Sequence, residues 1–245
     1  MNGEIVRLTV RQLLGKRRTL FLGLFALLPA GLAIAFRVSG GDDPERWTAT
    51  TLLAGVIVAV VLPLAGLVFG TSALGSEIED GTAVYILATP VARRDILLAK
   101  LAVAWAATTG FVVVSAVIAS LISIEGGQDG WRIILGFAAG GAVGSLAYCA
   151  VFVLLSVMTS RAFVIGLIYV FIWEGIVTGL FKGTRILSIR QCTLGLSGFF
   201  GDLDPRIYEP DLGGPTAAVV AVVAIVGASW LAIRRIKRFE VGESG

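Results

Sequence analysis

Residues 49–73 read ATTLLAGVIVAVVLPLAGLVFGTSA, a run of 25 positions without a single charged side chain. About 20 mainly apolar residues are enough for a helix to cross a hydrocarbon core of about 30 Å. No polar face interrupts the run at helical spacing, as an aqueous boundary would require. The run therefore predicts a membrane-spanning helix.

Five further runs of the same kind occur along the chain. They lie at roughly 19–36, 101–124, 133–158, 162–181 and 215–233. The whole chain of 245 residues is 56% hydrophobic and only 15% charged, with a mean hydropathy of +0.90, whereas soluble domains carry roughly 25% charged residues. The sequence thus predicts one all-α integral membrane domain over residues 1–245, with six transmembrane helices.

The distribution of lysine and arginine predicts the orientation of these spans. Thirteen of the 20 Lys and Arg residues fall in segments that would share one side of the membrane. The other side would hold the remaining seven, together with the acidic group Asp42, Asp43 and Glu45. Because short cytoplasmic segments are enriched in Lys and Arg, we expect both termini to be cytoplasmic. Residues 4–17 mix basic and apolar side chains, which predicts an N-terminal interfacial helix; an ordinary basic tail is the alternative.

Several classes of function are excluded or unsupported by composition. The chain has no histidine, which removes His-based metal sites and Ser-His-Asp triads. Its two cysteines, Cys149 and Cys192, cannot form a zinc or iron–sulfur site, and the net charge of +3 does not call for nucleic acid. No phosphate-binding G-x-x-x-x-G-K-[ST] motif is present, so this chain is not expected to hydrolyse ATP or to be an enzyme.

The connection between the second and third spans, residues 75–100, carries the densest set of local signals. It reads GSEIEDGTAVYILATPVARRDILLAK, and we call it the coupling loop. Ser76 and Glu79 have the spacing of a capping box, and Thr89 followed by Pro90 is a second helix-start signal. These signals predict a short helix, a corner and the first turn of the next span. Apolar side chains here need a partner, so we expect a docking element; the alternative is a solvated connector.

The coupling loop resembles the signature loop of ABC-2 type transporter permeases. The resemblance rests on Glu77-x-Glu79-x-Gly81-Thr82, Leu87-x-Thr89-Pro90 and Arg93-Arg94-Asp95-x-x-x-x-Lys100. It implies six spans, cytoplasmic termini, an N-terminal interfacial helix and a short cytoplasmic coupling helix between spans two and three. The residues that would engage an ATPase subunit are Glu77, Glu79, Gly81, Tyr85, Leu87, Thr89, Pro90, Arg93, Arg94 and Asp95.

The same resemblance implies the partners and the location. Two permease chains, this one with a second copy or a related chain, would each sit on a cytoplasmic ABC ATPase subunit. ATP and Mg²⁺ would be bound by that ATPase and not by this chain. The complex would be an exporter in the bacterial cell membrane, surrounded by lipid.

The end of the fifth span carries an ionisable residue, Glu174. Residues 169–191 read YVFIWEGIVTGLFKGTRILSIRQ and also resemble one branch of the same permeases. An ionisable residue within a span is a functional hypothesis by default, so Trp173, Glu174, Arg185 and Arg190 are candidates for an outer gate. We expect Glu174 to tie span five to residues 182–191; a role in the translocation path and a partly hydrated carboxylate are the alternatives. Ser188 is expected to begin one of the short helices in the outer loop, residues 182–214.

Span four places Gly136, Gly140 and Gly144 on one helix face. Small residues at this spacing allow another helix to approach closely. Packing within the chain is favoured over a dimer contact. Two other functions stay open for the whole chain: an ion-coupled secondary transporter that uses Glu174, and a membrane scaffold or sensor subunit that transports nothing.

Overall fold

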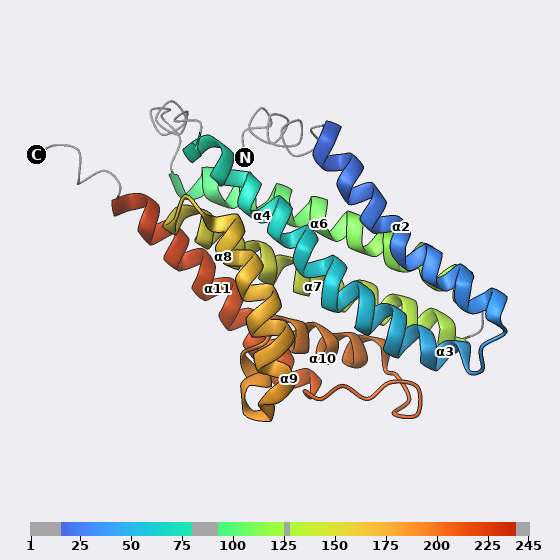
Figure 1. Ribbon diagram of the computed structural model, residues 1–245. Coiled ribbons are helices and arrows are strands. Elements are labelled where there is room, and N and C mark those ends of the chain that lie inside the picture. Colours follow the sequence, from blue (N-terminus) through green and yellow to red (C-terminus); the bar gives the residue numbers. More distant parts are fainter. Residues whose placement is uncertain (1–15, 80–92, 125–127, 239–245) are drawn as a thin grey trace, which may run out of the picture.

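The computed structural model describes residues 16–79, 93–124 and 128–238, and within these ranges every regular element is helical. Elements η1 and η2 are π-helical and η3 is a 3₁₀ helix. Figure 1 shows a bundle of long helices with a shorter helix, α10, packed at one end. The elements are α2 (Lys16–Ser39), α3 (Pro44–Trp47), η1 (Thr48–Val61), α4 (Leu62–Glu79), α6 (Arg93–Ser123), α7 (Gln128–Met158), α8 (Ala162–Ile168), η2 (Tyr169–Val177), α9 (Thr178–Leu180), η3 (Lys182–Leu187), α10 (Ile189–Gly201) and α11 (Gly214–Arg238).

Five helical stretches in the described ranges are long and apolar enough to cross a membrane. They match the second to sixth predicted spans in order, and most extend a few residues beyond the predicted limits. The first predicted span lies in α2, a helix of 24 residues that is about 36 Å long at 1.5 Å per residue; its crossing of the membrane stays a prediction. The five stretches are Pro44–Ala73, Arg94–Ser123, Gln128–Met158, Ala162–Leu180 and Gly214–Ile236.

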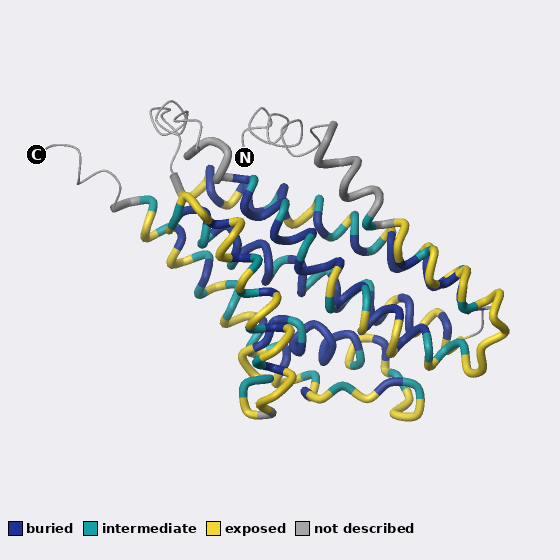
Figure 2. The backbone as a smooth tube through the Cα atoms, in the orientation of Figure 1, coloured by how far each residue is buried: buried dark blue, intermediate teal, exposed yellow. Residues whose placement is uncertain are grey.

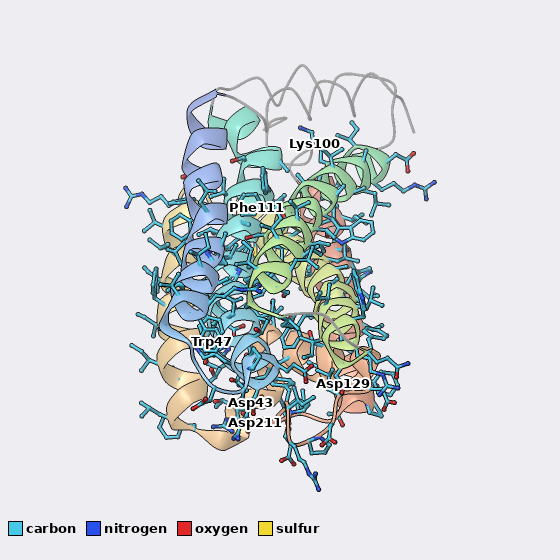
Figure 3. All side chains as sticks on the ribbon, turned by 90° about the vertical axis from the view of Figure 1, so that its right-hand side faces the viewer. Asp43, Trp47, Lys100, Phe111, Asp129 and Asp211 are labelled. Carbon is cyan, nitrogen blue, oxygen red and sulfur yellow. The ribbon has the colours of Figure 1, made fainter. Side chains whose placement is uncertain are left out.

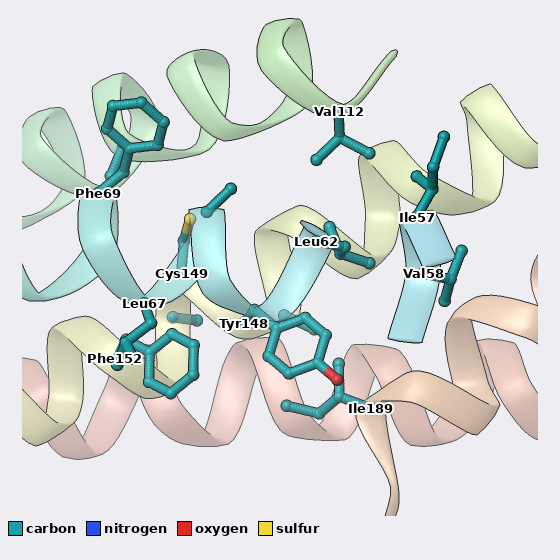
Figure 4. Close-up of a cluster of buried hydrophobic side chains, with 14 of the residues drawn as sticks. Ile57, Val58, Leu62, Leu67, Phe69, Val112, Tyr148, Cys149, Phe152 and Ile189 are labelled. Carbon is teal, nitrogen blue, oxygen red and sulfur yellow. The ribbon is translucent and has the colours of Figure 1, made fainter. Parts of the chain in front are cut away.

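Helix α7 is the centre of the bundle. It packs against α4, α6, α10 and α11, and more than half of its apolar stretch is buried within the chain. Two glycines of α4 permit close approach to α7, because a Cβ added at Gly66 would lie 3.0 Å from Cβ of Tyr148, and one added at Gly70 would lie 2.9 Å from Cβ of Phe152. Figure 4 shows the aromatic side chains of α7 among buried aliphatic residues of its neighbours.

The outer helices present apolar side chains to the surroundings. Figure 2 shows long exposed stretches on α8, η2 and α11, in contrast to the buried α7 and α10. Phe171 is 59% exposed, Val219 is 64% exposed and Val223 is 65% exposed. Apolar area of this extent would drive aggregation in water. It is the surface expected of helices whose solvent is lipid.

The labelled charged residues lie at two opposite ends of the bundle. The start of α2 and the end of α11 lie toward the same end (Figure 1). Figure 3 shows Lys100 near this end, and Asp43, Asp129 and Asp211 at the opposite end. The side of the membrane that each end faces stays a prediction.

The prediction that a helix begins at Ser76 is wrong. Ser76 and Glu79 were expected to begin a helix, but both lie in the last turns of α4, which continues unbroken to Glu79. A capping box satisfies free N–H groups at a helix start. In α4 the helix has already begun at Leu62, so the pattern at Ser76 has no such groups to satisfy.

Candidate functional site

Five of the ten predicted coupling residues belong to the two helices that flank residues 80–92. Gly81, Tyr85, Leu87, Thr89 and Pro90 lie outside the described residues. Glu77 and Glu79 belong to the last turn of α4, and Arg93 is the first residue of α6. In the first turn of α6, Nε of Arg94 lies 3.5 Å from Oδ1 of Asp95, and both side chains are exposed. The structure therefore places the two ends of the predicted docking element, and its middle stays a prediction.

The second candidate region is built around Glu174, and a π-helical segment positions it. In η2 the backbone pairs residue i with i+5; just past its end, the N–H of Thr178 donates to the carbonyl of Trp173. Residues five apart consequently lie one above the other on the same face. Tyr169 and Glu174 have this spacing, and Oη of Tyr169 donates to Oε1 of Glu174 at 3.0 Å.

The Glu174 carboxylate binds the start of α10. The backbone N–H of Ile189 donates to Oε1 at 2.9 Å, and that of Arg190 donates to the same oxygen at 3.4 Å. Oγ of Ser188 donates to Oε2 and also accepts from the backbone N–H of Gln191 at 3.1 Å. The first N–H groups of a helix have no partner within the helix and carry partial positive charge. Glu174 satisfies two of them and Ser188 a third.

This arrangement explains how a carboxylate is held deep in an apolar bundle. Glu174 is only 3% exposed, and isolated buried charges are strongly unfavourable unless they are hydrogen-bonded. Here the donors come from one tyrosine, one serine and two backbone amides. The link between span five and residues 182–191 is present as these hydrogen bonds.

Arg185 and Trp173 lie apart from that link. Nη1 of Arg185 pairs with Oδ1 of Asp211 at 2.8 Å, and Nε of Arg185 donates to the carbonyl of Thr178 at 3.4 Å. Arg185 thus joins the end of span five to the segment before α11. Trp173 is half-buried beside Glu174 in the chain.

Three buried polar groups near the start of α10 have no hydrogen-bond partner among the described residues: Oη of Tyr148, Nε of Arg190 and Oε1 of Gln191. Figure 4 shows the Tyr148 hydroxyl pointing toward Ile189, the first residue of α10. Sequence reasoning did not single out Tyr148 or Tyr169. For Tyr169 the five-residue spacing to Glu174 was visible, but it gains meaning only in a π-helix.

The glycine face of α7 receives α10. A Cβ added at Gly136 would lie 2.6 Å from the carbonyl oxygen of Ser197, and one at Gly140 would lie 2.7 Å from the Ser197 nitrogen. A Cβ at Gly144 would lie 2.8 Å from Cγ2 of Thr193. Real Cβ atoms do not approach so closely, so all three positions require glycine for α10 to lie where it does.

On its other side α10 packs against α11. The Cβ that Gly195 lacks would lie 2.8 Å from Cβ of Ala217. The hydroxyls of Thr193 and Ser197 donate to carbonyls of α10 itself, at 2.8 and 2.9 Å, which leaves the face toward α7 held by packing. Helix α10 is therefore bound by hydrogen bonds at its start and by close packing along its length.

The chemistry available to this region is that of a structural latch. Within the described residues, no group of His, Cys, Asp and Glu could hold a metal ion. The groups around Glu174 are hydrogen-bond donors directed at one carboxylate. These hydrogen bonds fix the position of α10. If α10 moved away from Glu174, its donors would need another acceptor.

Comparison with models of known protein families gives a match to the chain. A family model described as ABC-2 family transporter protein matches residues 15–180, more than half of the chain. The match covers α2 to α9 and includes both Glu174 and the coupling loop. No curated protein matches the sequence.

Proposed function

The chain belongs to the ABC-2 transporter family, and on that premise we propose that it is the membrane subunit of an ABC exporter that is driven by a separate ATPase. Membership of the family makes it a multi-pass permease. The proposal concerns the ATPase partner, the direction of transport and the residues that contact the ATPase.

The observation that carries the proposal is the family match together with the absence of a nucleotide-binding motif from the sequence. An ABC-2 family permease that has no phosphate loop in its sequence is expected to use ATP hydrolysis by a partner subunit. In the proposed complex two permease chains pair, each on one cytoplasmic ATPase that binds ATP and Mg²⁺. Six spans with cytoplasmic termini, the first in α2, place residues 80–92 on the ATPase side of the cell membrane.

The coupling loop is the proposed contact with the ATPase. Tyr85 and Leu87 supply apolar anchors, since a few buried side chains dominate the energy of an interface. Acidic residues before these anchors and basic residues after them fix the register. The exposed Arg94–Asp95 pair at the start of α6 is in a position to meet a partner. The proposed contact set is Glu77, Glu79, Gly81, Tyr85, Leu87, Thr89, Pro90, Arg93, Arg94 and Asp95.

At the far end, α10 is the proposed outer gate element. Glu174 latches its first turn, Arg185 ties span five to the segment before α11, and Arg190 and Trp173 flank the latch. The glycine face of α7 gives α10 a smooth contact on which small shifts are possible, as in shear motions of packed helices. The use of Glu174 in the latch argues against a proton-carrying role, because its oxygens already accept four hydrogen bonds.

Photo-crosslinking at Leu87 tests this function. A photoreactive amino acid replaces Leu87 in cells that express the permease and the other subunits of its transporter, and the crosslinked products are identified by mass spectrometry. We expect a crosslink to a cytoplasmic protein that carries a Walker motif. A matched probe at Phe171, 59% exposed on η2, should not reach that protein. Crosslinks of residue 87 to lipid or to the chain itself alone would refute the proposed contact.

A further inference from the structure

Lys100 is the most deeply buried basic side chain in the described residues. It is 1% exposed, and a lysine is almost never fully buried unless it is paired. Leu97 and Leu101, close to it in the sequence of α6, are also buried. An ionisable side chain in such surroundings is rare because its burial costs free energy, so a functional role is the first hypothesis for it.

The ammonium group of Lys100 joins two helices. Nζ donates to the carbonyl oxygen of Ala73 in α4 at 2.9 Å. Lys100 lies seven residues after the first residue of α6, and Ala73 lies six residues before the last residue of α4. At 1.5 Å per residue these distances are roughly 10 and 9 Å along the two helices. The bond therefore bridges α4 and α6 at matched depth, two turns below the point where residues 80–92 connect them.

The volume of the space around Lys100 does not by itself call for a lysine. Buried ion pairs that are replaced whole by hydrophobic residues of similar volume often show no loss of stability, so burial of a charge is weak evidence for a stabilising role. Methionine has nearly the same length and would fill the same apolar space. Lysine adds a directional bond between α4 and α6.

We propose that Lys100 is a positioning residue that makes α4 and α6 move together when the coupling loop is displaced. The inference rests on the proposed function, because the displacement comes from the ATPase. Without the Lys100–Ala73 bond, a push on the loop can slide α6 past α4 and is lost before it reaches α7 and α10. With the bond, both helices transmit it, and α7 packs against both.

The test uses the complex of this chain with its ATPase subunit, reconstituted in liposomes. Hydrogen exchange of the α10 amides is measured by mass spectrometry with and without ATP, next to the rate of ATP hydrolysis. We expect K100M to assemble and to hydrolyse ATP, while the ATP-dependent difference in α10 exchange falls by roughly fivefold or more, the scale of coupling between sites. K100R, which retains a donor, should preserve most of the difference.

Thr108→Val is the matched control. Thr108 is a buried polar residue of the same helix whose hydroxyl lies 3.2 Å from Sγ of Cys149 in α7, and its loss should leave the ATP-dependent difference intact. An unchanged difference in K100M would overturn the role of Lys100. If K100M does not assemble, K100Q is measured in its place, and failure of both to assemble would also overturn it, since Lys100 would then serve the fold. A wild-type complex without an ATPase subunit would instead refute the proposed function.

Discussion

Replacement of Glu174 by alanine should destabilise the bundle strongly, because several donors lose their acceptor at once. The change leaves the Ser188 hydroxyl and the Ile189 amide without a partner, and both residues are buried, at 0% and 6% exposure. An unsatisfied buried donor costs about 1–3 kcal/mol. The expected loss is therefore about 2–6 kcal/mol, before any contribution from Tyr169, which is less buried.

Glutamine at the same position refines the prediction. The side-chain carbonyl of Glu174→Gln can still accept from Ile189 and Tyr169, but its amide nitrogen cannot accept from Ser188. One buried donor is lost, so the expected loss is about 1–3 kcal/mol, smaller than for alanine. Transport per folded complex should change little in this variant, since the latch keeps its geometry.

The assay is reversible unfolding of the purified chain in mixed detergent micelles, followed by circular dichroism. Glu209→Ala is the control, because Glu209 is an exposed acidic residue and surface changes usually stay within about 0.5 kcal/mol. A loss below about 0.5 kcal/mol for Glu174→Ala would refute the latch. So would normal stability combined with abolished transport in Glu174→Gln, which would assign Glu174 to the translocation path.

Three further predictions concern packing, docking and thiol reactivity. Gly140→Ala should cost about 1–3 kcal/mol of stability by overpacking, since the new Cβ would lie 2.7 Å from the Ser197 backbone nitrogen. Gly110→Ala is the control and should not destabilise the protein, because the space around Gly110 is open. Equal melting temperatures for the two variants would contradict the close packing of α10. Leu87→Asp should abolish co-purification of the ATPase while membrane insertion survives, because a charge enters an apolar contact; normal assembly would show that Leu87 is not an anchor. Burial raises the pKa of Cys192 to about 11, so little reactive thiolate exists at pH 8. Maleimide should therefore label Cys192 only after denaturation. Rapid labelling of Cys192 in the folded chain would contradict the burial of α10.

The spans could be predicted because lipid leaves few choices to a chain. A run such as residues 49–73 must be helical to satisfy its backbone in a membrane, and the described helices coincide with five of the six predicted spans. The start of α10 was also predictable, since Ser188 is an N-cap whose side chain accepts from Gln191. These features depend on local sequence alone.

The partners of Glu174 were not predictable in the same way. The sequence pointed to residues 182–191 as the partner of Glu174, with Arg185 and Arg190 as charged candidates there, but Arg185 pairs with Asp211 and backbone amides of α10 bind the carboxylate. Backbone amides carry no mark in the sequence, and only the tertiary approach of α10 brings them to η2.

Two other features follow from the structure rather than the sequence. No signal in the sequence distinguishes the π-helix η2 from an ordinary α-helix, so the Tyr169–Glu174 pair could not be read from a five-residue spacing. Lys100 was part of the recognised motif, yet its hydrogen bond to Ala73 joins residues of two different helices. Both contacts bring together groups whose relation is set by the fold.

The mass and composition of the intact complex, purified from its native membrane, test the central claim most directly. Native mass spectrometry of that complex, paired with an assay of ATP hydrolysis, counts the subunits and shows which of them uses ATP. We predict two permease chains with two copies of a Walker-motif ATPase, and hydrolysis that is lost when the ATPase is removed. A transport-active assembly that contains no ATPase subunit would contradict the proposed function.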